Sequence, residues 1–532
     1  MNLKKSIWLV LISLMLFIAA CGKKEDTIQE EDLDNLNETG FPIVDENIEL
    51  KFFARQEAAT SDDWNDVLIF NEYEGMTNIE IDWEMAPADS FSEKFNLALG
   101  GGDLPDAFHS AMVSESDLTK YGKQGVFIPL DDLIDDYAPN FKQLMEEYPE
   151  VEEAVTMPDG NIYSFPFMNH PEFTSKRVAP YPFINQDWLD ALNMDMPETT
   201  EDYYDYLKAV KEDNPSNGDV DEIPFGGHNV TLLYNYLKGA FGVANKGVGV
   251  DNIDIDPETG DYRFYPTSDN YKELLTYLNK LYEEELIEQN IFSIDPEQYA
   301  ANASEGRYGS IVWYGPPNKE DNYKGMPALE GPNGDKLFTD VNSPVEHAGA
   351  FVITSENEHP AATVRWIDHF YGEEGMKLFF LGVEGETYEV DEDGNPDFIK
   401  DVYDPETDDS SALKDYLTFG GGGYPALTIE NYFRGAETAP EALEAADTLE
   451  PDLLEDPWPN EKYTSEEVDQ LQGFGSDIDE YVGEMRDKFI SGNESLDQWD
   501  DYVETLERIG LDDYMEIKIK AIERQTELIE EN

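Results

Sequence analysis

The chain is poor in the residues that most often carry redox and metal chemistry. Among 532 residues there is one cysteine, Cys21, and there are six histidines. An intramolecular disulfide, a zinc site built on thiolates and Cys-x-x-Cys redox chemistry are therefore excluded. The sequence also has no HExxH, GxxxxGK[ST] or GxSxG pattern, which argues against a zinc protease, a P-loop nucleotide hydrolase and an α/β-hydrolase.

Positive charge is scarce as well. The 35 lysines and arginines face 117 aspartates and glutamates, so the net charge is 35 − 117 = −82. A surface this acidic repels phosphate backbones and anionic lipid headgroups. We therefore expect no binding to nucleic acid and no electrostatic binding to a membrane.

Apolar material, in contrast, is plentiful. Hydrophobic residues make up 40 % of the chain and aromatic residues 12 %, which excludes wholesale disorder. A single hydrophobic core stops growing at about 250–300 residues. The chain therefore needs at least two lobes.

The first twenty residues have the pattern of a bacterial export signal. Two lysines precede an apolar run over residues 7–17, which is short for a membrane-spanning helix and has no stop-transfer pattern after it. The run leads through Ile18-Ala19-Ala20 to Cys21, a string that resembles the lipobox of bacterial lipoproteins. The resemblance implies cleavage of residues 1–20 and lipidation of Cys21, the alternative being an unprocessed signal with a chance cysteine. Residues 21–47 are polar and acidic, so we expect a flexible, lipid-anchored linker.

The body begins with alternating strands and helices. Residues 48–54 and 79–83 have the pattern of strands, residues 91–99 that of a helix, and residues 104–108 that of a strand re-entering the sheet. This order predicts an α/β fold with a largely parallel sheet. A second region of similar character begins near residue 171, and the C-terminal segment is predicted to be helical.

Two acidic strings lie between strand-like segments of this body. They are residues 251–256, followed by Thr259-Gly260, and residues 391–397, which contain Asp393-Gly394. In so acidic a chain such turn dipeptides favour β-hairpins over metal sites.

Several strings, in this order and spacing, resemble the bacterial extracellular solute-binding proteins of carbohydrate-uptake ABC transporters, family 1, in the long lipoprotein subgroup of the LplA type. The resemblance spans roughly residues 48–532. The strings, besides the lipobox, are LALG at 97–100, GDLPD at 102–106, PDGNIY at 158–163, DWLDAL at 187–192, PETT at 197–200, LYEE at 281–284, residues 306–313 and AFVIT at 350–354.

This resemblance implies a type II-like periplasmic-binding-protein fold with multiple crossovers, in which each lobe is a mostly parallel sheet flanked by helices. By analogy, residues 48–168 and 340–415 form lobe 1, and residues 172–335 and 420–532 form lobe 2. The lobes close on a ligand, and the closed form docks on a membrane permease driven by a cytoplasmic ATPase.

A loop at residues 213–224, DNPSNGDVDEIP, spaces its oxygen-bearing side chains around a glycine, as loops that bind calcium do. It resembles the calcium loop of the same subgroup. The resemblance implies a structural Ca²⁺ held by the side chains of Asp213, Asn217, Asp221 and Glu222 and by the carbonyl of Asp219. Pro215 stands where the family has an asparagine, which removes one ligand, and a polar turn is the alternative. No catalytic cofactor is expected.

Sugars are held by aromatic faces and by polar side chains that bind hydroxyls. Trp313 and Tyr314 end a strand, where an α/β sheet places its ligand crevice, and the corresponding family segment carries an aromatic residue of the cleft. The other candidates follow strands or lie in loops near the expected hinge. They are Arg55, His109, Ser110, Tyr163, Phe167, Arg177, Tyr181 and Tyr424. A core position or a surface ion pair is the alternative for each.

The function expected from these observations is that of a monomeric, lipid-anchored receptor outside the cell. It would capture an oligosaccharide and deliver it to an ABC permease without catalysing a reaction. Two alternatives stay open: a surface enzyme that degrades glycans with paired carboxylates, and the same fold binding a peptide. The scattered histidines argue against metal uptake.

Overall fold

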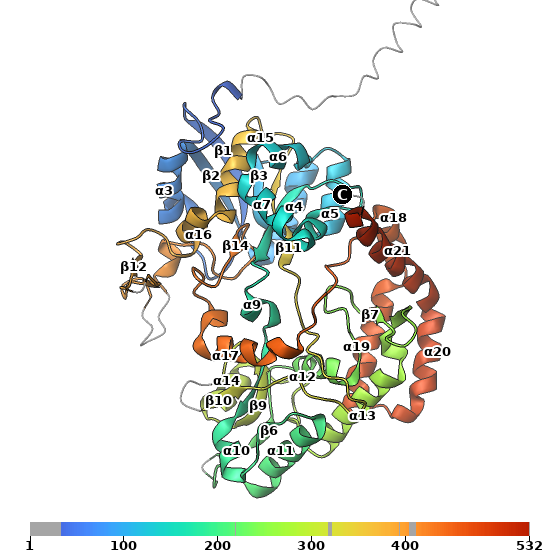
Figure 1. The fold of residues 1–532 in the computed structure, drawn as a ribbon. Coiled ribbons are helices and arrows are strands. Elements are labelled where there is room, and N and C mark those ends of the chain that lie inside the picture. Colours follow the sequence, from blue (N-terminus) through green and yellow to red (C-terminus); the bar gives the residue numbers. More distant parts are fainter. Residues whose placement is uncertain (1–32, 219, 318–321, 393, 404–410, 531–532) are drawn as a thin grey trace, which may run out of the picture.

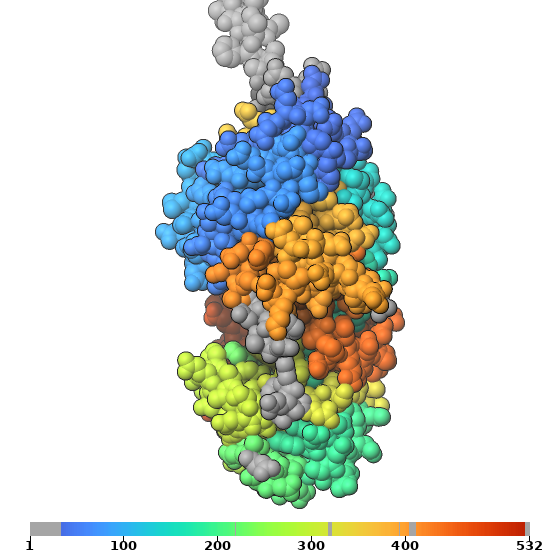
Figure 2. Space-filling view, turned by 90° about the vertical axis from the view of Figure 1, so that its left-hand side faces the viewer, coloured from blue at the N-terminus to red at the C-terminus, as the bar shows by residue number. Residues whose placement is uncertain are grey.

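The structure is a computed structural model that describes residues 33–218, 220–317, 322–392, 394–403 and 411–530. Two hydrophobic cores divide these residues into two lobes, which lie one above the other in Figures 1 and 2. The two-lobed α/β fold expected from the sequence is confirmed.

Lobe 1 is built on a six-stranded sheet in the order β14-β4-β11-β3-β1-β2. β11 is antiparallel to both of its neighbours, whereas the other pairs are parallel. The sheet is therefore mixed rather than mostly parallel, because β11 enters it directly from the other lobe. The strands are β1 (Ile48–Gln56), β2 (Ile79–Pro87), β3 (Ala107–Val113), β4 (Ser164–Asn169), β11 (Val345–Ile353) and β14 (Leu427–Thr428).

Helices flank this sheet, and a separate small hairpin lies on the side that faces the viewer in Figure 2. The helices are α3 (Leu68–Thr77), α4 (Ala88–Gly101), α5 (Glu115–Lys123), α6 (Asp131–Tyr137), α7 (Pro139–Glu147), α8 (Pro149–Val155), α15 (Pro360–Asp368) and α16 (Glu373–Phe380). The hairpin is β12 (Tyr388–Val390) with β13 (Pro396–Phe398), which confirms the turn expected from the acidic string at 391–397.

Lobe 2 is built on a four-stranded sheet in the order β10-β5-β9-β6, of which only the β6–β9 pair is parallel. The acidic string at 251–256 forms a separate hairpin, as expected. The strands are β5 (Tyr181–Asn185), β6 (Ile223–Phe225), β9 (Tyr308–Trp313) and β10 (Tyr323–Gly325), and the hairpin is β7 (Ile253–Ile255) with β8 (Tyr262–Phe264). The helices are α10 (Gln186–Leu192), α11 (Thr200–Asp213), α12 (Val230–Leu237), α13 (Asp269–Glu283), α14 (Pro296–Ser304), α17 (Pro440–Leu449), α19 (Gly475–Ser491) and α20 (Trp499–Ile509).

Within the described residues the chain crosses between the cores three times, at residues 173–178, 341–345 and 433–442. The first crossing contains the short helix α9 (Thr174–Val178), which lies between the lobes in Figure 1. The expected third boundary, at 415–420, is wrong. Tyr424 and Phe433 belong to the core of lobe 1, and β14 pairs with β4.

The last helices run from lobe 2 back to lobe 1 (Figure 1). α18 (Ser465–Leu471) packs on α5, and α21 (Leu511–Glu530) packs on α8. Just before α18, the buried Lys462 ammonium donates hydrogen bonds to the carbonyls of Glu153 and Thr156 at the end of α8, the latter at 3.0 Å. These contacts join the lobes beside the three crossings.

The described part of the expected linker is folded onto lobe 1. Ile43 and Val44 are buried in its core, and the Arg365 guanidinium donates to the carbonyls of Asn37 and Gly40. The linker is therefore not flexible from residue 35 to residue 45. Cys21 and the signal segment lie outside the described residues. Among those that are described, no helix is long and apolar enough to cross a membrane.

Candidate functional site

Two cavities lie between the lobes. We call the first the central cavity; its volume is about 490 Å³, and lobe 1 contributes Met112, Phe167 and the glycine run 421–423. Lobe 2 contributes Val248 and Tyr314. The second, which we call the aromatic cavity, measures about 670 Å³ and is lined among others by Trp313, Tyr314, Phe398, Tyr403, Leu417 and Phe419. Tyr314 lines both cavities, so they are two compartments of one cleft.

Aromatic residues at the end of β9 form the lobe 2 wall of this cleft. The Trp313 ring stacks on His228, with centroids 5.6 Å apart and planes 16° apart, and also contacts Tyr299. Tyr314 follows Trp313 beyond the strand and is 43 % exposed. An exposed aromatic face held on a packed base suits the apolar face of a sugar ring.

The glycine run brings backbone into the central cavity from the lobe 1 side. Gly421, Gly422 and Gly423 all have positive φ, between 76° and 90°. A Cβ on Gly423 would lie 2.8 Å from the Met112 sulfur. Side chains at these positions would therefore strain the loop and fill the cavity.

Three charged side chains line the central cavity, each from within or directly after a different crossing between the lobes. They are Lys176 on α9, Glu346 at the start of β11 and Glu437 in the third crossing. The Lys176 ammonium lies 2.7 Å from a Glu437 carboxylate oxygen and 4.0 Å from one of Glu346. We call these three residues the hinge cluster.

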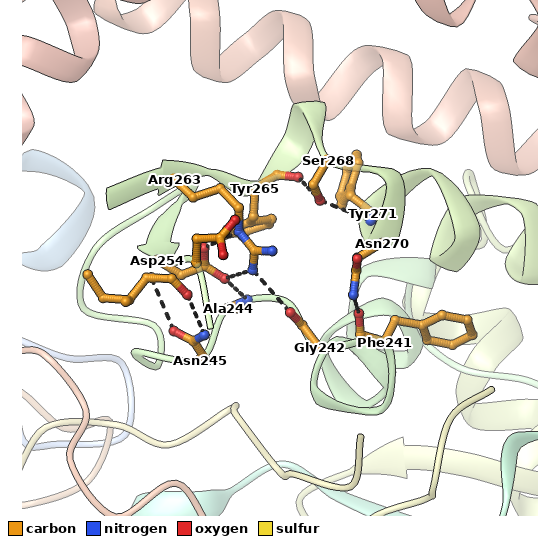
Figure 3. A network of polar contacts seen from close by, with 12 residues as sticks. Phe241, Gly242, Ala244, Asn245, Asp254, Arg263, Tyr265, Ser268, Asn270 and Tyr271 are labelled. Carbon is orange, nitrogen blue, oxygen red and sulfur yellow. Dashed lines mark hydrogen bonds and ion pairs between the residues drawn. The ribbon is translucent and has the colours of Figure 1, made fainter. Parts of the chain in front are cut away.

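A buried ion pair in lobe 2 supports the loop that carries Val248 to the central cavity. In Figure 3 the Arg263 guanidinium binds both carboxylate oxygens of Asp254, at 2.8 and 2.7 Å. The same carboxylate accepts the backbone N–H of Ala244 at 2.9 Å, and Arg263 also donates to the carbonyl of Gly242. The pair thus ties the hairpin β7–β8 to the segment that enters the cleft.

The structure brings three of the predicted ligand residues to the cavities: Trp313, Tyr314 and Phe167. Tyr424 lies one layer behind, with its ring centroid 4.5 Å from that of Phe167. Arg55 lies beside the central cavity, where its guanidinium is paired with Glu57 and contacts the Met112 sulfur. It does not line the cavity.

The other predicted ligand residues line neither cavity. His109 and Ser110 are buried in lobe 1, and the Tyr163 hydroxyl binds Asp159. The Arg177 guanidinium donates to the carbonyls of Pro171 and Asn342. The Tyr181 hydroxyl binds the Ser175 hydroxyl. The side chains of all these residues therefore contact other parts of the protein and not the cavities.

Several residues that line the central cavity belong to no recognisable sequence pattern. Lys176 directly precedes the predicted Arg177, but Glu346 and Glu437 belong to no motif. Asn342 and Asn460 come from polar segments without a recognisable pattern. Only the fold shows that these residues converge on the central cavity.

The predicted calcium loop has the turn geometry and the oxygen donors that suit a hard cation. Asn214, Asn217 and Gly218 have positive φ, and Glu222 folds back to accept the backbone N–H of Ser216 at 2.6 Å. However, Asp221 pairs with Arg307 at 2.7 Å. Within the described ranges no three acidic or histidine side chains are grouped closely enough for a metal ion; Asp219 lies outside those ranges.

Comparisons with known proteins point to one family. The sequence model of the family of bacterial extracellular solute-binding proteins matches residues 58–377. Over 94 % of its length the chain is 32 % identical to the fructooligosaccharide ABC transporter substrate-binding protein FusA of Streptococcus pneumoniae, and the match covers 95 % of that protein.

Solved structures agree with this match. The structure of S. pneumoniae FusA with kestose superposes with a TM-score of 0.71, at 29 % identity, over 91 % of this chain and 99 % of that one. A structure of the FusA EF-hand mutant with fructo-nystose superposes with a TM-score of 0.70, at 28 % identity and with the same coverage.

Proposed function

Because this chain belongs to the family of bacterial extracellular solute-binding proteins, we propose that it captures an oligosaccharide between its lobes and delivers it to an ABC permease for import. The observation that carries the proposal is Tyr314, an exposed aromatic side chain shared by both compartments of the cleft. The similarity to FusA supports a fructooligosaccharide as the first ligand to test.

Replacing Tyr314 with alanine is expected to weaken oligosaccharide binding by about 10- to 100-fold. The stacking platform between the compartments would be lost, and stacking of one ring on an aromatic face is worth roughly 1–3 kcal/mol. The measurement is calorimetric titration of the chain from residue 22 with kestose and with other neutral and acidic trisaccharides. Replacing Tyr282, which lies on lobe 2 outside both cavities, with alanine is the control and should leave affinity unchanged.

The same titration separates the receptor from the alternative of a glycan-degrading enzyme. A receptor returns the sugar intact, so chromatography after long incubation should recover all of it. Shortened products would show a hydrolase. If no saccharide in the panel binds, transport of oligosaccharides is contradicted, and peptides become the ligands to test.

We further propose that Cys21 carries the lipid that holds the protein at the outer face of the cell membrane. The support is the lipobox-like string before it. Replacing Cys21 with serine in the full-length chain should move the protein from the detergent phase to the aqueous phase in a phase-partition assay and abolish palmitate labelling. Unchanged partitioning would contradict lipidation.

We also propose that the loop at 213–222 binds a structural calcium ion. The support is its oxygen donors and positive-φ turn, together with the EF-hand of the similar protein FusA. Calcium at one hundred times its dissociation constant should stabilise the protein by about 2.7 kcal/mol, visible as a chelator-sensitive rise in melting temperature. Glu222→Gln should remove the rise, whereas Glu258→Gln in the exposed turn of the β7–β8 hairpin should not; an identical response in the two variants would contradict the proposal.

A further inference from the structure

The charges that face the central cavity are unbalanced. Two carboxylates, Glu346 and Glu437, share one ammonium group, that of Lys176. Lys176 is closer to Glu437, and the side chains of these two are only 14 % and 11 % exposed. Glu346 is 32 % exposed and, besides the distant ammonium, accepts a 2.5 Å hydrogen bond from the Asn169 side chain. The hinge cluster therefore leaves one carboxylate facing the cavity with capacity to accept further hydrogen bonds.

Cations beside the cavity have their donors engaged by other groups, so these donors are not free to bind a carboxylate of a ligand. The Arg55 guanidinium is paired with Glu57, and the Lys462 ammonium is buried against carbonyls at the end of α8. The Arg177 guanidinium donates to two carbonyls. Burial lowers the pKa of His347, next to Glu346, which favours the neutral form of its ring.

From this arrangement we infer that the central cavity selects an uncharged, hydroxyl-rich saccharide and rejects saccharides that carry carboxylates, and that Glu346 is the residue that sets this preference. The inference rests on the proposed function and narrows its substrate class. Hydroxyl groups donate to the free lone pairs of Glu346, and a hydrogen bond to a charged acceptor is about twice as strong as one between neutral groups.

A uronate in the same place would bring a third carboxylate to a single ammonium group. In a partly buried site the ligand carboxylate loses part of its hydration. Like charges placed side by side across an interface also repel strongly and weaken binding. The net charge of −82 adds a long-range repulsion, which salt screens beyond about 8–10 Å. The local carboxylates therefore decide the preference at physiological salt.

The hinge cluster also connects this selection to closure of the lobes. Lys176 and Glu437 lie in the first and third crossings, and Glu346 directly follows the second. A ligand hydroxyl bound by Glu346 therefore lies beside the segments that join the lobes. A ligand whose hydroxyls donate to Glu346 binds the closed form more tightly than the open form, and so it favours closure.

The test compares kestose, a neutral trisaccharide, and trigalacturonate, an acidic one of equal length, within a panel of neutral trisaccharides. Titrations use the chain from residue 22, which keeps every described element, at 150 mM salt. The tightest neutral ligand is expected to bind at least about 100-fold better than trigalacturonate. Glu346→Gln keeps the size and one acceptor of the side chain. It should weaken binding of the neutral ligand up to about tenfold, and it should lower the ratio of neutral to acidic affinity by about tenfold.

The matched control is Glu444→Gln, which removes an exposed carboxylate paired with Lys324 on the outer face of α17. It should leave both affinities and their ratio unchanged. Equal binding of trigalacturonate by the wild type, or a ratio that Glu346→Gln does not change, would overturn the inference while the receptor function stood. Failure of the wild type to bind any saccharide would overturn the proposed function and the inference with it.

Discussion

Replacing Asp254 with alanine is expected to lower the free energy of unfolding by about 3–5 kcal/mol. The Asp254 side chain is fully buried and that of Arg263 is 15 % exposed, so the variant leaves a nearly buried guanidinium without its carboxylate. It also leaves the Ala244 N–H without its acceptor, which adds the cost of an unsatisfied buried donor. The measurement is urea denaturation at pH 7.

The same variant should weaken ligand binding, because the loop from Gly242 to Val248 loses the hydrogen bond between the Ala244 N–H and Asp254, one of its attachments to the β7–β8 hairpin (Figure 3). Asp261→Ala, in the exposed turn of the same hairpin, is the control and should change stability by no more than about 0.5 kcal/mol. The double variant Asp254→Leu with Arg263→Met should recover most of the loss, since well-packed apolar side chains can replace a buried ion pair. A loss below about 1 kcal/mol in Asp254→Ala would contradict the role given to the pair.

Local sequence patterns were enough to predict most of the fold of lobe 1. The alternation at 48–54 and 79–83 corresponds to β1 and β2, because one face of each strand packs on helices. Strand direction was not predictable. The run at 348–353 is apolar throughout, and its antiparallel placement follows from where the chain returns across the cleft. The two-residue strand β14 is too short to show any periodicity, so no local pattern indicates that the chain is still in lobe 1 beyond the boundary at 415–420 that the family analogy predicts.

The predicted ligand residues line the cavities where a strand ends at the expected residue, and lie elsewhere where it does not. β9 ends at Trp313, as expected, so its aromatic residues reach the cleft. β3 was expected to end near Phe108 but continues to Val113. Ser110 and Met112 have positive φ, and it is Met112, not His109, that reaches the central cavity. The hinge cluster could not be predicted, since its three members are far apart in sequence and meet only at the crossings.

The burial of His109 in the core of lobe 1 is expected to have the second large effect, a loss of stability at acid pH. Its ring is fully buried, in contact with the rings of Trp64, Trp83 and Phe351, and burial lowers its pKa from 6.5 to about 3. The folded protein keeps the ring neutral while the unfolded chain protonates it below pH 6.5. This difference should remove about 4 kcal/mol of stability by pH 3 and none above pH 7.

His109→Leu, which is similar in volume and does not titrate, isolates this contribution. Subtracting the variant's pH–stability curve from that of the wild type cancels the carboxylates, whose titration the two proteins share. The difference should be flat above pH 7 and fall by about 1.4 kcal/mol per pH unit between pH 6 and pH 4. Phe70→Leu loosens the same aromatic cluster without removing a proton site, so its curve should lie about 1 kcal/mol below the wild type at every pH. Parallel curves for His109→Leu and the wild type would mean that the folded protein protonates His109 as readily as the unfolded chain does, and a ring so enclosed by aromatic side chains gives no physical reason for that.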